Sequence, residues 1–218
     1  MKGAHLKFVN DIIKPWDELN ELLTLRYVFE PELSDITRIA ASLAVFINHY
    51  GEPNFMPDQL AQESFDMKII RDVADSSKHF KLSNPARQSK LSVGALFEVR
   101  DDNQFRFLRN RTHILHSTEG ELDFMIVSLG SIRYWIDMLG LDINWNGEVK
   151  EAVQEYYPTA WLNYEPKYCI NVHTTNYRFF KLEGDSLQPY DPPNWVGEIY
   201  DAGKLGARVV TRNGKLIL

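Results

Sequence analysis

The segment from Leu122 to Leu139 constrains the fold more than any other part of this sequence. Apolar residues recur along it at the three- and four-residue steps of an α-helix, at Leu122, Met125, Ile126, Leu129, Ile132 and Ile136. Further apolar residues fill the remaining sides, namely Val127, Tyr134, Trp135 and Met138. A helix that is apolar on nearly all sides has to be covered on nearly all sides. We therefore expect either the central helix of a bundle or a helix shared with a second copy of the chain in a homodimer.

Helical periodicity also dominates the chain before this segment. One helix is expected to begin at Pro15 and end near Glu30, and the capping-box spacing of Thr118 and Glu121 is expected to open the apolar helix. Gly140 is expected to end the apolar helix. Three more stretches show the same periodicity, namely Ile36–Tyr50, Pro57–Glu63 and Asp66–Phe80. The N-terminal part is therefore predicted to be a helical bundle.

Two other regions have the short apolar runs and turn residues of β-strands. The first is expected to form a small antiparallel sheet from Val93–Arg100, Gln104–Leu108 and Thr112–His116. The second lies near the C-terminus, with strands expected at Tyr168–Thr174, Tyr177–Leu182, Gly197–Asp201, Arg208–Val210 and Lys215–Leu218. Asn213-Gly214 supplies the positive φ angles of a hairpin turn between the last two of these strands. A short helix is expected at Gly147–Tyr156.

These patterns predict an α+β fold in which a helical bundle carries an inserted antiparallel sheet and is followed by a β-rich segment. The predicted domains are residues 1–141 with the insertion at 93–116, a connector at 142–163, and a small β-rich domain at 164–218. The C-terminal aromatics Tyr190, Trp195 and Tyr200 are interpreted either as core and turn packing or as a loop that recognises a protein partner.

Composition narrows the setting in which the protein works. The chain has no run approaching 18 apolar residues and no charged-then-apolar leader, which favours a cytoplasmic protein that does not enter a membrane. Cys169 is the only cysteine, which excludes an internal disulfide. The net charge of −6 gives no global attraction to nucleic acid. Between Lys78 and Arg111, however, eight basic residues stand against three acidic ones, a local charge of +5 that would suit phosphate binding.

The helix expected at Asp66–Phe80 carries the most interesting polar residues. Arg71, Asp75 and His79 are spaced four residues apart and would line up along one side of it. An acid or base, a carboxylate that orients it and a cation for phosphate are the groups that a metal-independent ribonuclease needs. The other interpretation is an ordinary solvated helix face.

The chain also resembles a known superfamily, with two amphipathic helices, a helix carrying Arg-Asp-x-x-Asp-x-x-Lys-His-Phe, a strand insertion and a long aromatic helix. This order is similar to that of bacterial proteins related to the HEPN (higher eukaryotes and prokaryotes nucleotide-binding) superfamily, over roughly Phe8 to Leu141. The resemblance implies a helical, often dimeric protein, and a metal-independent ribonuclease or toxin of a phage-defence or toxin–antitoxin system. Many relatives have lost catalytic activity and act by binding alone.

The superfamily's active motif is an Arg, usually followed by a polar residue, with a His after four to six intervening residues. His79 follows Arg71 after seven, whereas His116 follows Arg111 after four and Arg109 after six. The resemblance therefore implies Arg71, Asp75, His79, Arg111 and His116 as catalytic candidates, and Lys78, Arg106 and Arg109 as candidates for RNA binding. No cofactor or metal is expected, because His113 and His116 would face opposite sides of a strand.

Two hypotheses about function remain open at this point. The first is an RNA-acting protein of a bacterial defence or toxin system. The second is a non-catalytic module that dimerises through the apolar helix and binds a protein through its C-terminal aromatics. The basic block favours the first hypothesis, and the acidic net charge favours the second.

Overall fold

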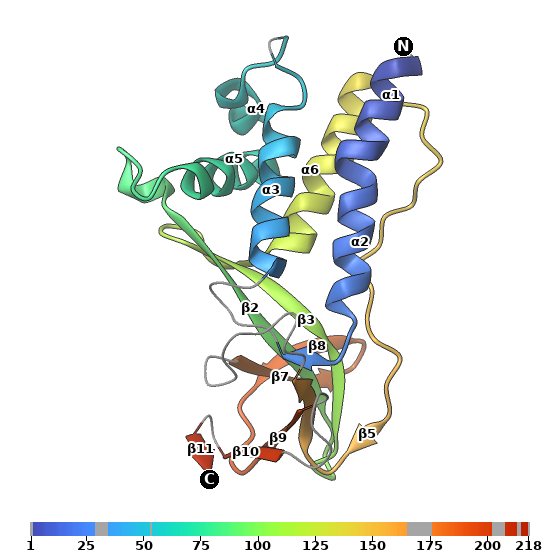
Figure 1. Ribbon diagram of the computed structural model, residues 1–218, viewed down its shortest axis with the longest axis vertical. Coiled ribbons are helices and arrows are strands. Elements are labelled where there is room, and N and C mark those ends of the chain that lie inside the picture. The colour runs from blue at the N-terminus through green and yellow to red at the C-terminus, as the bar shows by residue number, and fades with distance from the viewer. Residues whose placement is uncertain are drawn as a thin grey trace. The chain divides into compact units, whose positions relative to one another are not determined.

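The computed structural model describes residues 2–28, 35–52, 54–164, 176–201, 208–212 and 215–217. It confirms the α+β fold, with helices toward the N-terminus and a β-rich C-terminal part (Figure 1). The chain forms two compact units that are interleaved along the sequence. The first unit contains Met1–Leu22, Thr37–Ser92 and Thr112–Val149, and the second contains Leu23–Ile36, Val93–Arg111 and Lys150–Leu218. The predicted domains, by contrast, follow one another along the chain.

The first helical stretch is longer at its start and shorter at its end than predicted. It runs through α1 (Lys2–Phe8), the π-helical turn η1 (Val9–Ile13) and α2 (Lys14–Leu23) without leaving helical backbone angles at Phe8 or Lys14. Pro15 therefore lies near the middle of this stretch and does not begin it. Proline has no N–H for a helical hydrogen bond, and the π-helical turn ends two positions before Pro15 in the chain.

Three further helices of the N-terminal part follow the predicted periodicity closely. They are α3 (Asp35–His49), α4 (Pro57–Glu63) and α5 (Phe65–Lys78). The N-terminus of α5 is capped by the Ser64 side chain, which accepts a hydrogen bond from the Met67 N–H. The helix ends at His79, whose backbone is extended, so His79 is not part of α5.

The apolar helix is α6 (Phe124–Leu139), and it occupies the centre of the first unit. The Trp16 indole donates to Ser128 Oγ at 2.9 Å, and the Trp135 indole donates to the Ile47 carbonyl at 2.8 Å. These contacts come from two different helices, and Phe124, Met125, Ile132 and Trp135 are all buried. Other helices of the unit therefore cover one side of α6, as expected for a helix of the bundle core, whereas Ile126 of the predicted apolar stripe is 59% exposed.

The start of α6 was predicted wrongly. Thr118 and Glu121 do not form a capping box, because residues 120–123 form β4 (Gly120–Asp123) and pair antiparallel with the preceding strand. Gly120 has a φ of 76°, which allows the tight turn into β4. Asp123 is the actual cap and accepts from the Met125 N–H at 2.9 Å. Gly140 ends the helix in the left-handed conformation, as predicted.

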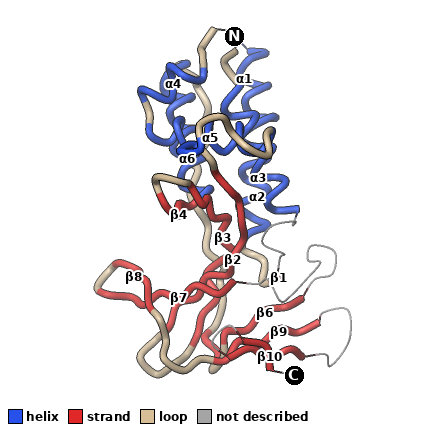
Figure 2. The backbone as a smooth tube through the Cα atoms, turned by 90° about the vertical axis from the view of Figure 1, so that its left-hand side faces the viewer, coloured by secondary structure: helices blue, strands red, loops and turns tan. Residues whose placement is uncertain are grey.

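The β-structure forms two sheets. The six-stranded sheet has the order β4-β3-β2-β7-β8, with β5 paired to β3, and contains β2 (Ser89–Val99), β3 (Phe105–His116), β5 (Tyr156–Tyr157), β7 (Asn176–Glu183) and β8 (Ser186–Tyr190). The five-stranded sheet has the order β1-β6-β9-β10-β11, with β1 (Tyr27–Val28), β6 (Ala160–Tyr164), β9 (Val196–Asp201), β10 (Arg208–Arg212) and β11 (Lys215–Ile217). The β7–β8 hairpin is visible in Figure 2.

Strands predicted as separate pieces are joined in these sheets. Thr112–His116 is not a third strand but the continuation of β3. The predicted hairpin near the C-terminus is confirmed, since Arg212 pairs with Lys215. The helix expected at Gly147–Tyr156 is wrong, because residues 141–155 have no regular secondary structure. The strand expected at Tyr168–Thr174 and the residue Cys169 lie outside the described residues.

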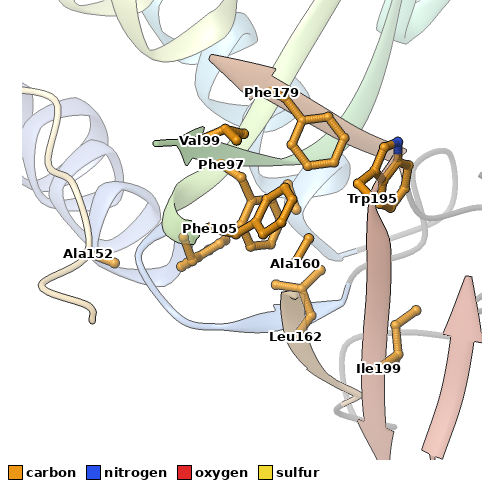
Figure 3. Close-up of a cluster of buried hydrophobic side chains, with 11 residues drawn as sticks. Phe97, Val99, Phe105, Ala152, Ala160, Leu162, Phe179, Trp195 and Ile199 are labelled. Atoms are coloured by element: carbon orange, nitrogen blue, oxygen red, sulfur yellow. The ribbon is translucent and has the colours of Figure 1, made fainter. Parts of the chain in front are cut away.

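An aromatic core holds the second unit together (Figure 3). The Phe179 ring lies 4.7 Å from the Trp195 ring and 5.8 Å from the Phe105 ring, centroid to centroid. β2 pairs in parallel with β7, so Phe97 is the register partner of Phe179. The predicted insertion and the C-terminal strands therefore share one sheet and one core. Trp195 belongs to this core, as the packing interpretation of the C-terminal aromatics required.

Candidate functional site

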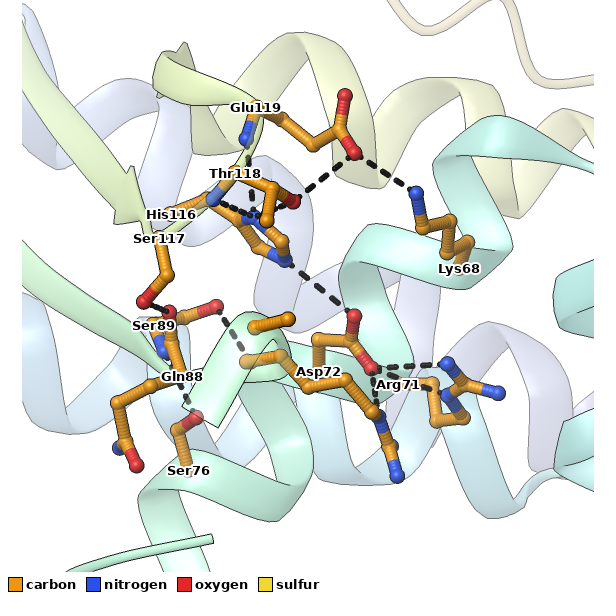
Figure 4. A network of polar contacts seen from close by, with 12 residues as sticks. Lys68, Arg71, Asp72, Ser76, Gln88, Ser89, His116, Ser117, Thr118 and Glu119 are labelled. Carbon is orange, nitrogen blue, oxygen red and sulfur yellow. Dashed lines mark hydrogen bonds and ion pairs between the residues drawn. The ribbon is translucent and has the colours of Figure 1, made fainter. Parts of the chain in front are cut away.

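A network of polar contacts surrounds Asp72 on α5 in the first unit (Figure 4). One carboxylate oxygen, Oδ1, accepts from Arg87 Nε at 2.6 Å and from Arg71 Nε at 3.1 Å. The other, Oδ2, lies 3.3 Å from His116 Nε2. The Asp72 side chain is fully buried and that of His116 is 1% exposed. We call Asp72, Arg71, Arg87 and His116 the Asp72 network.

The hydrogen bonds around His116 determine where its proton lies. Its Nδ1 faces two backbone N–H groups, of Thr118 at 3.3 Å and of Glu119 at 3.2 Å. A nitrogen that accepts from backbone donors carries no proton, so Nε2 holds the proton and donates it to Asp72. All hydrogen-bonding positions of the ring are thus occupied by the protein.

Neighbouring charges close the Asp72 network on its outer side. Arg87 also donates to Asp75 at 2.5 Å, and Arg71 pairs with Asp58 at 2.9 Å. Burial lowers the pKa of Arg87, but hydrogen bonds and charge from Asp72 and Asp75 outweigh it and raise this pKa above its usual value. The cation is therefore permanent, and it neutralises carboxylates of its own chain.

A lysine holds the turn that follows His116. Lys68 Nζ donates to Glu119 Oε1 at 2.8 Å, and this hydrogen bond, with one from the Thr118 hydroxyl, lowers the pKa of Glu119. Ser117 donates from its N–H to the Gln88 carbonyl at 3.0 Å. The β3–β4 turn, η2 (Pro85–Arg87) and α5 are thereby fixed around the imidazole.

Three of the five predicted catalytic residues, Arg71, Asp75 and His116, meet in or beside the Asp72 network. Because His116 is buried and fully hydrogen-bonded, it offers no open nitrogen to a substrate. The Asp75 carboxylate contacts Arg87. Its backbone carbonyl accepts from the His79 N–H at 3.0 Å, but among the described residues no hydrogen bond joins the Asp75 carboxylate to the His79 imidazole. Arg111 is half-buried and belongs to the second unit.

Sequence reasoning did not single out Asp72 or Arg87 for this network. Arg87 lies 15 positions from Asp72 in the sequence, beyond α5, and only the path of the chain through η2 brings its guanidinium back. No local pattern marks Asp72 as the buried carboxylate, because Asp75 lies on a similar side of the helix. The one sequence signal for this network was a basic residue, Arg87, at the end of the loop that follows α5.

The three residues predicted to bind RNA have different surroundings. Arg106 pairs with Glu98 at 2.6 Å and with Glu151 at 3.6 Å. Arg109 is only 7% exposed, whereas Lys78 is exposed at the end of α5. Arg106 and Arg109 are thus neutralised internally or buried. The exposed members of the basic block are Lys78 and Lys81 at the end of α5, and Lys90 and Arg100 on β2 and the turn after it.

Residues 78–81, which we call the α5 tip, combine cations with an open aromatic ring. Phe80 is fully exposed, and Lys78, His79 and Lys81 beside it are exposed as well. The His79 imidazole makes no hydrogen bond or ion pair within the part of the chain that the structure describes. An exposed aromatic side chain with cations on both sides is the combination with which proteins bind single-stranded nucleic acid.

The α5 tip contacts a second carboxylate–histidine pair that sequence reasoning missed. His49, the last residue of α3, donates from Nδ1 to Glu52 Oε1 at 2.8 Å. Its Nε2 faces Lys78 Nζ and, at 3.2 Å, Asn48 Nδ2. The His49 side chain is 30% exposed, in contrast to that of His116. The His-x-x-Glu spacing across a helix end was the only signal for this pair.

The turn that carries Glu52 is held by α6. A Cβ at Gly51 would overlap the Trp135 ring, so only glycine fits there. Tyr50 and Phe55 pack edge-on against Trp135, with ring centroids 5.7 and 5.8 Å away. The residues on both sides of Glu52 are therefore packed against α6, while the Glu52 side chain itself is 40% exposed.

Other kinds of site find less support in the described residues. No group of three His, Cys, Asp or Glu side chains there is arranged to hold a metal ion. Nor does any helix within the described ranges reach the length and apolarity needed to cross a bilayer.

Comparison with known proteins gives no relative from which to transfer a role. No protein-family model, no curated protein and no solved structure matches this chain.

Proposed function

We propose that this protein acts on RNA, as a metal-independent ribonuclease or toxin of a bacterial defence or toxin–antitoxin system in the cytoplasm. The observation that carries the proposal is the α5 tip, where a fully exposed Phe80 stands among exposed Lys78, His79 and Lys81. Proteins bind single-stranded nucleic acid by stacking bases on aromatic rings and holding phosphates with cations. The resemblance to HEPN proteins favours RNA, and the tip lies within the segment that resembles them.

The acidic net charge is compatible with this proposal. Electrostatic binding depends on the charges that face the phosphates, and the tip has three exposed basic side chains within four residues. The carboxylates nearest to the tip are already paired, Asp75 with Arg87 and Glu52 with His49. We therefore expect short-range, salt-sensitive binding without long-range attraction.

The test is binding of a fluorescein-labelled single-stranded oligoribonucleotide, followed by fluorescence anisotropy. Phe80→Ala is expected to weaken binding by about 1–3 kcal/mol, because one stacked base is lost. Lys81→Ala is expected to lower the slope of log Kd against log salt by about 1. Phe46→Ala, at a half-exposed phenylalanine on α3, is the matched control and should bind like the wild type. Absence of RNA binding by the wild type would refute the proposal.

The second candidate is a non-catalytic module that forms a homodimer or binds a protein partner. It is favoured by exposed apolar side chains in the first unit, such as Met56, Phe65 and Ile126, which are 54%, 50% and 59% exposed. Half of the α6 residues are buried within the unit, so a dimer would have to use these exposed side chains, of which Ile126 lies on α6. Light scattering across a concentration series tests it, and a constant monomer mass would exclude the dimer.

A further inference from the structure

We infer that His49, oriented by Glu52 and facing Lys78, is the acid–base centre of an RNA-cleaving site at the α5 tip. This inference rests on the proposed function and names the groups that would do its chemistry. It differs from the predicted assignment to His79 or His116. The argument depends on which nitrogen of each histidine is open, on what each ring contacts and on what lies beside it.

The tautomer of His49 suits a general base. Because Nδ1 donates to Glu52, the lone pair lies on Nε2, which points to the Lys78 ammonium and the Asn48 amide. Asn48 is 2% exposed and fixes the inner side of the ring. Lys78 is a long, exposed side chain that can move aside, so a substrate hydroxyl can take its place at Nε2. A nucleophile, a base and a carboxylate that orients the base then stand in line.

The neighbouring residues supply what the base alone lacks. Lys78 brings a cation to the phosphate next to the reacting hydroxyl, where negative charge increases in the transition state. Phe80, two residues further along, offers a surface on which a flanking base can stack. Since Lys78 belongs to the tip and also contacts His49, the base and the RNA-binding surface are parts of one site.

The reaction that these groups support is a transesterification within the RNA. His49 Nε2 takes the proton from a ribose 2′-hydroxyl, and the 2′-oxygen attacks the adjacent phosphorus. The P–O2′ bond forms while the P–O5′ bond breaks, and the leaving 5′-oxygen takes a proton from the Lys78 ammonium. The products are a 2′,3′-cyclic phosphate and a 5′-hydroxyl. Proton transfer from His49 back to Lys78, which it contacts in the resting state, restores both groups.

The experiment uses the full chain and a labelled single-stranded oligoribonucleotide, with a second oligonucleotide that carries 2′-O-methyl groups throughout. His49→Gln is expected to lower the cleavage rate by about 100-fold or more while RNA binding changes less than about twofold, since general acid–base catalysis contributes 10²–10⁴-fold. His5→Gln is the matched histidine control, on α1, and should cleave like the wild type. The methylated RNA should be bound but not cleaved.

Glu52 is a positioning residue, so its variants test orientation of the base. Glu52→Gln is expected to lower kcat roughly tenfold with little change in KM, and Glu52→Asp should restore part of that loss. A merely structural role would lower the melting temperature without this split between kcat and KM.

The outcomes separate the inference from the function on which it rests. If the wild type binds RNA but does not cleave it, or if His49→Gln cleaves at the wild-type rate, the inference is overturned and RNA binding stands. Cleavage of the methylated RNA would overturn it too, because the 2′-hydroxyl would not be the nucleophile. If the wild type binds no RNA at all, the proposed function fails first.

Discussion

Two of the carboxylate–histidine pairs of the first unit have opposite surroundings. Asp72 and His116 are both buried, and each polar atom of the imidazole already has a partner from the protein. Glu52 and His49 are 40% and 30% exposed, and the outer nitrogen of the ring faces only an amide and a movable lysine. The same two functional groups thus form a closed structural centre in one place and an accessible reactive centre in the other.

These two surroundings show that the role of a histidine is inferred from the partners of its two ring nitrogens rather than from the sequence motif around it. His116 satisfies the spacing of the superfamily motif, yet backbone N–H groups occupy its Nδ1. His49 satisfies no such spacing, yet its Nε2 can be uncovered by the movement of one side chain. Variants of the two pairs should therefore behave in opposite ways in stability and activity.

The largest expected effect is at the centre of the closed pair. Asp72→Ala should lower the free energy of unfolding by about 3 kcal/mol, because Arg87, Arg71 and His116 lose their shared buried acceptor, while the two arginines keep only the more exposed Asp75 and Asp58 as partners. Denaturant unfolding measures this change. Glu52→Ala, the matched carboxylate of the open pair, should cost no more than about 0.5 kcal/mol. Equal losses for both variants would abolish the distinction between the pairs.

A smaller effect is expected from removing the histidines. His116→Ala should cost about 1–3 kcal/mol, since it leaves Asp72 and two backbone N–H groups short of a partner in a buried site. His49→Ala should leave the melting temperature nearly unchanged and yet lose RNA cleavage. In a bacterial host, expression of the wild type should slow growth and degrade RNA, and His49→Ala should relieve both. Relief by a fully folded His116→Ala protein would contradict this assignment.

The smallest expected effect concerns Lys68, whose hydrogen bond to Glu119 holds the turn after His116. The pKa of Glu119 is lowered mainly by its hydrogen bond with Lys68, so its folded-state pKa lies below its unfolded-state pKa. The stabilisation is then present above the unfolded-state value and is lost as the pH falls through the folded-state value. Melting curves of wild type and Glu119→Gln should differ slightly at neutral pH and converge in acid. A melting-temperature difference that grows in acid would contradict the lowered pKa of Glu119. Added salt should reduce the difference seen at neutral pH.

The sequence predicted those parts of the fold that depend on local patterns. The apolar stripe of α6 and its all-round apolarity indicated a central helix, and Gly140 ends it as predicted. The start of α6 was missed because Gly120 turns the chain into β4, after which Asp123 caps the helix. Thr118 and Glu121 have the spacing of a cap, but the pairing of β4 with β3 determines the backbone there.

The sites depended on contacts that no local pattern contains. Arg71 and Asp75 were correctly expected to share a polar surface of α5, but burial of Asp72 follows from Arg87 and His116. The sequence analysis did not single out His49, since Lys78, which faces it, lies 29 positions later in the sequence. Side chains brought together over such separations are visible only once the chain is folded.

The interleaving of the two units has a consequence for folding during synthesis. Each unit is made of three segments separated along the chain, and the last segment of the first unit ends at Val149. A ribosome releases these segments in order, so the helices before α6 emerge without the helix that fills their centre. Until α6 leaves the exit tunnel, the apolar surfaces that will contact Trp135 are open to chaperones and to other nascent chains. Folding of the second unit is completed later still, because its sheets combine strands from early and late parts of the chain.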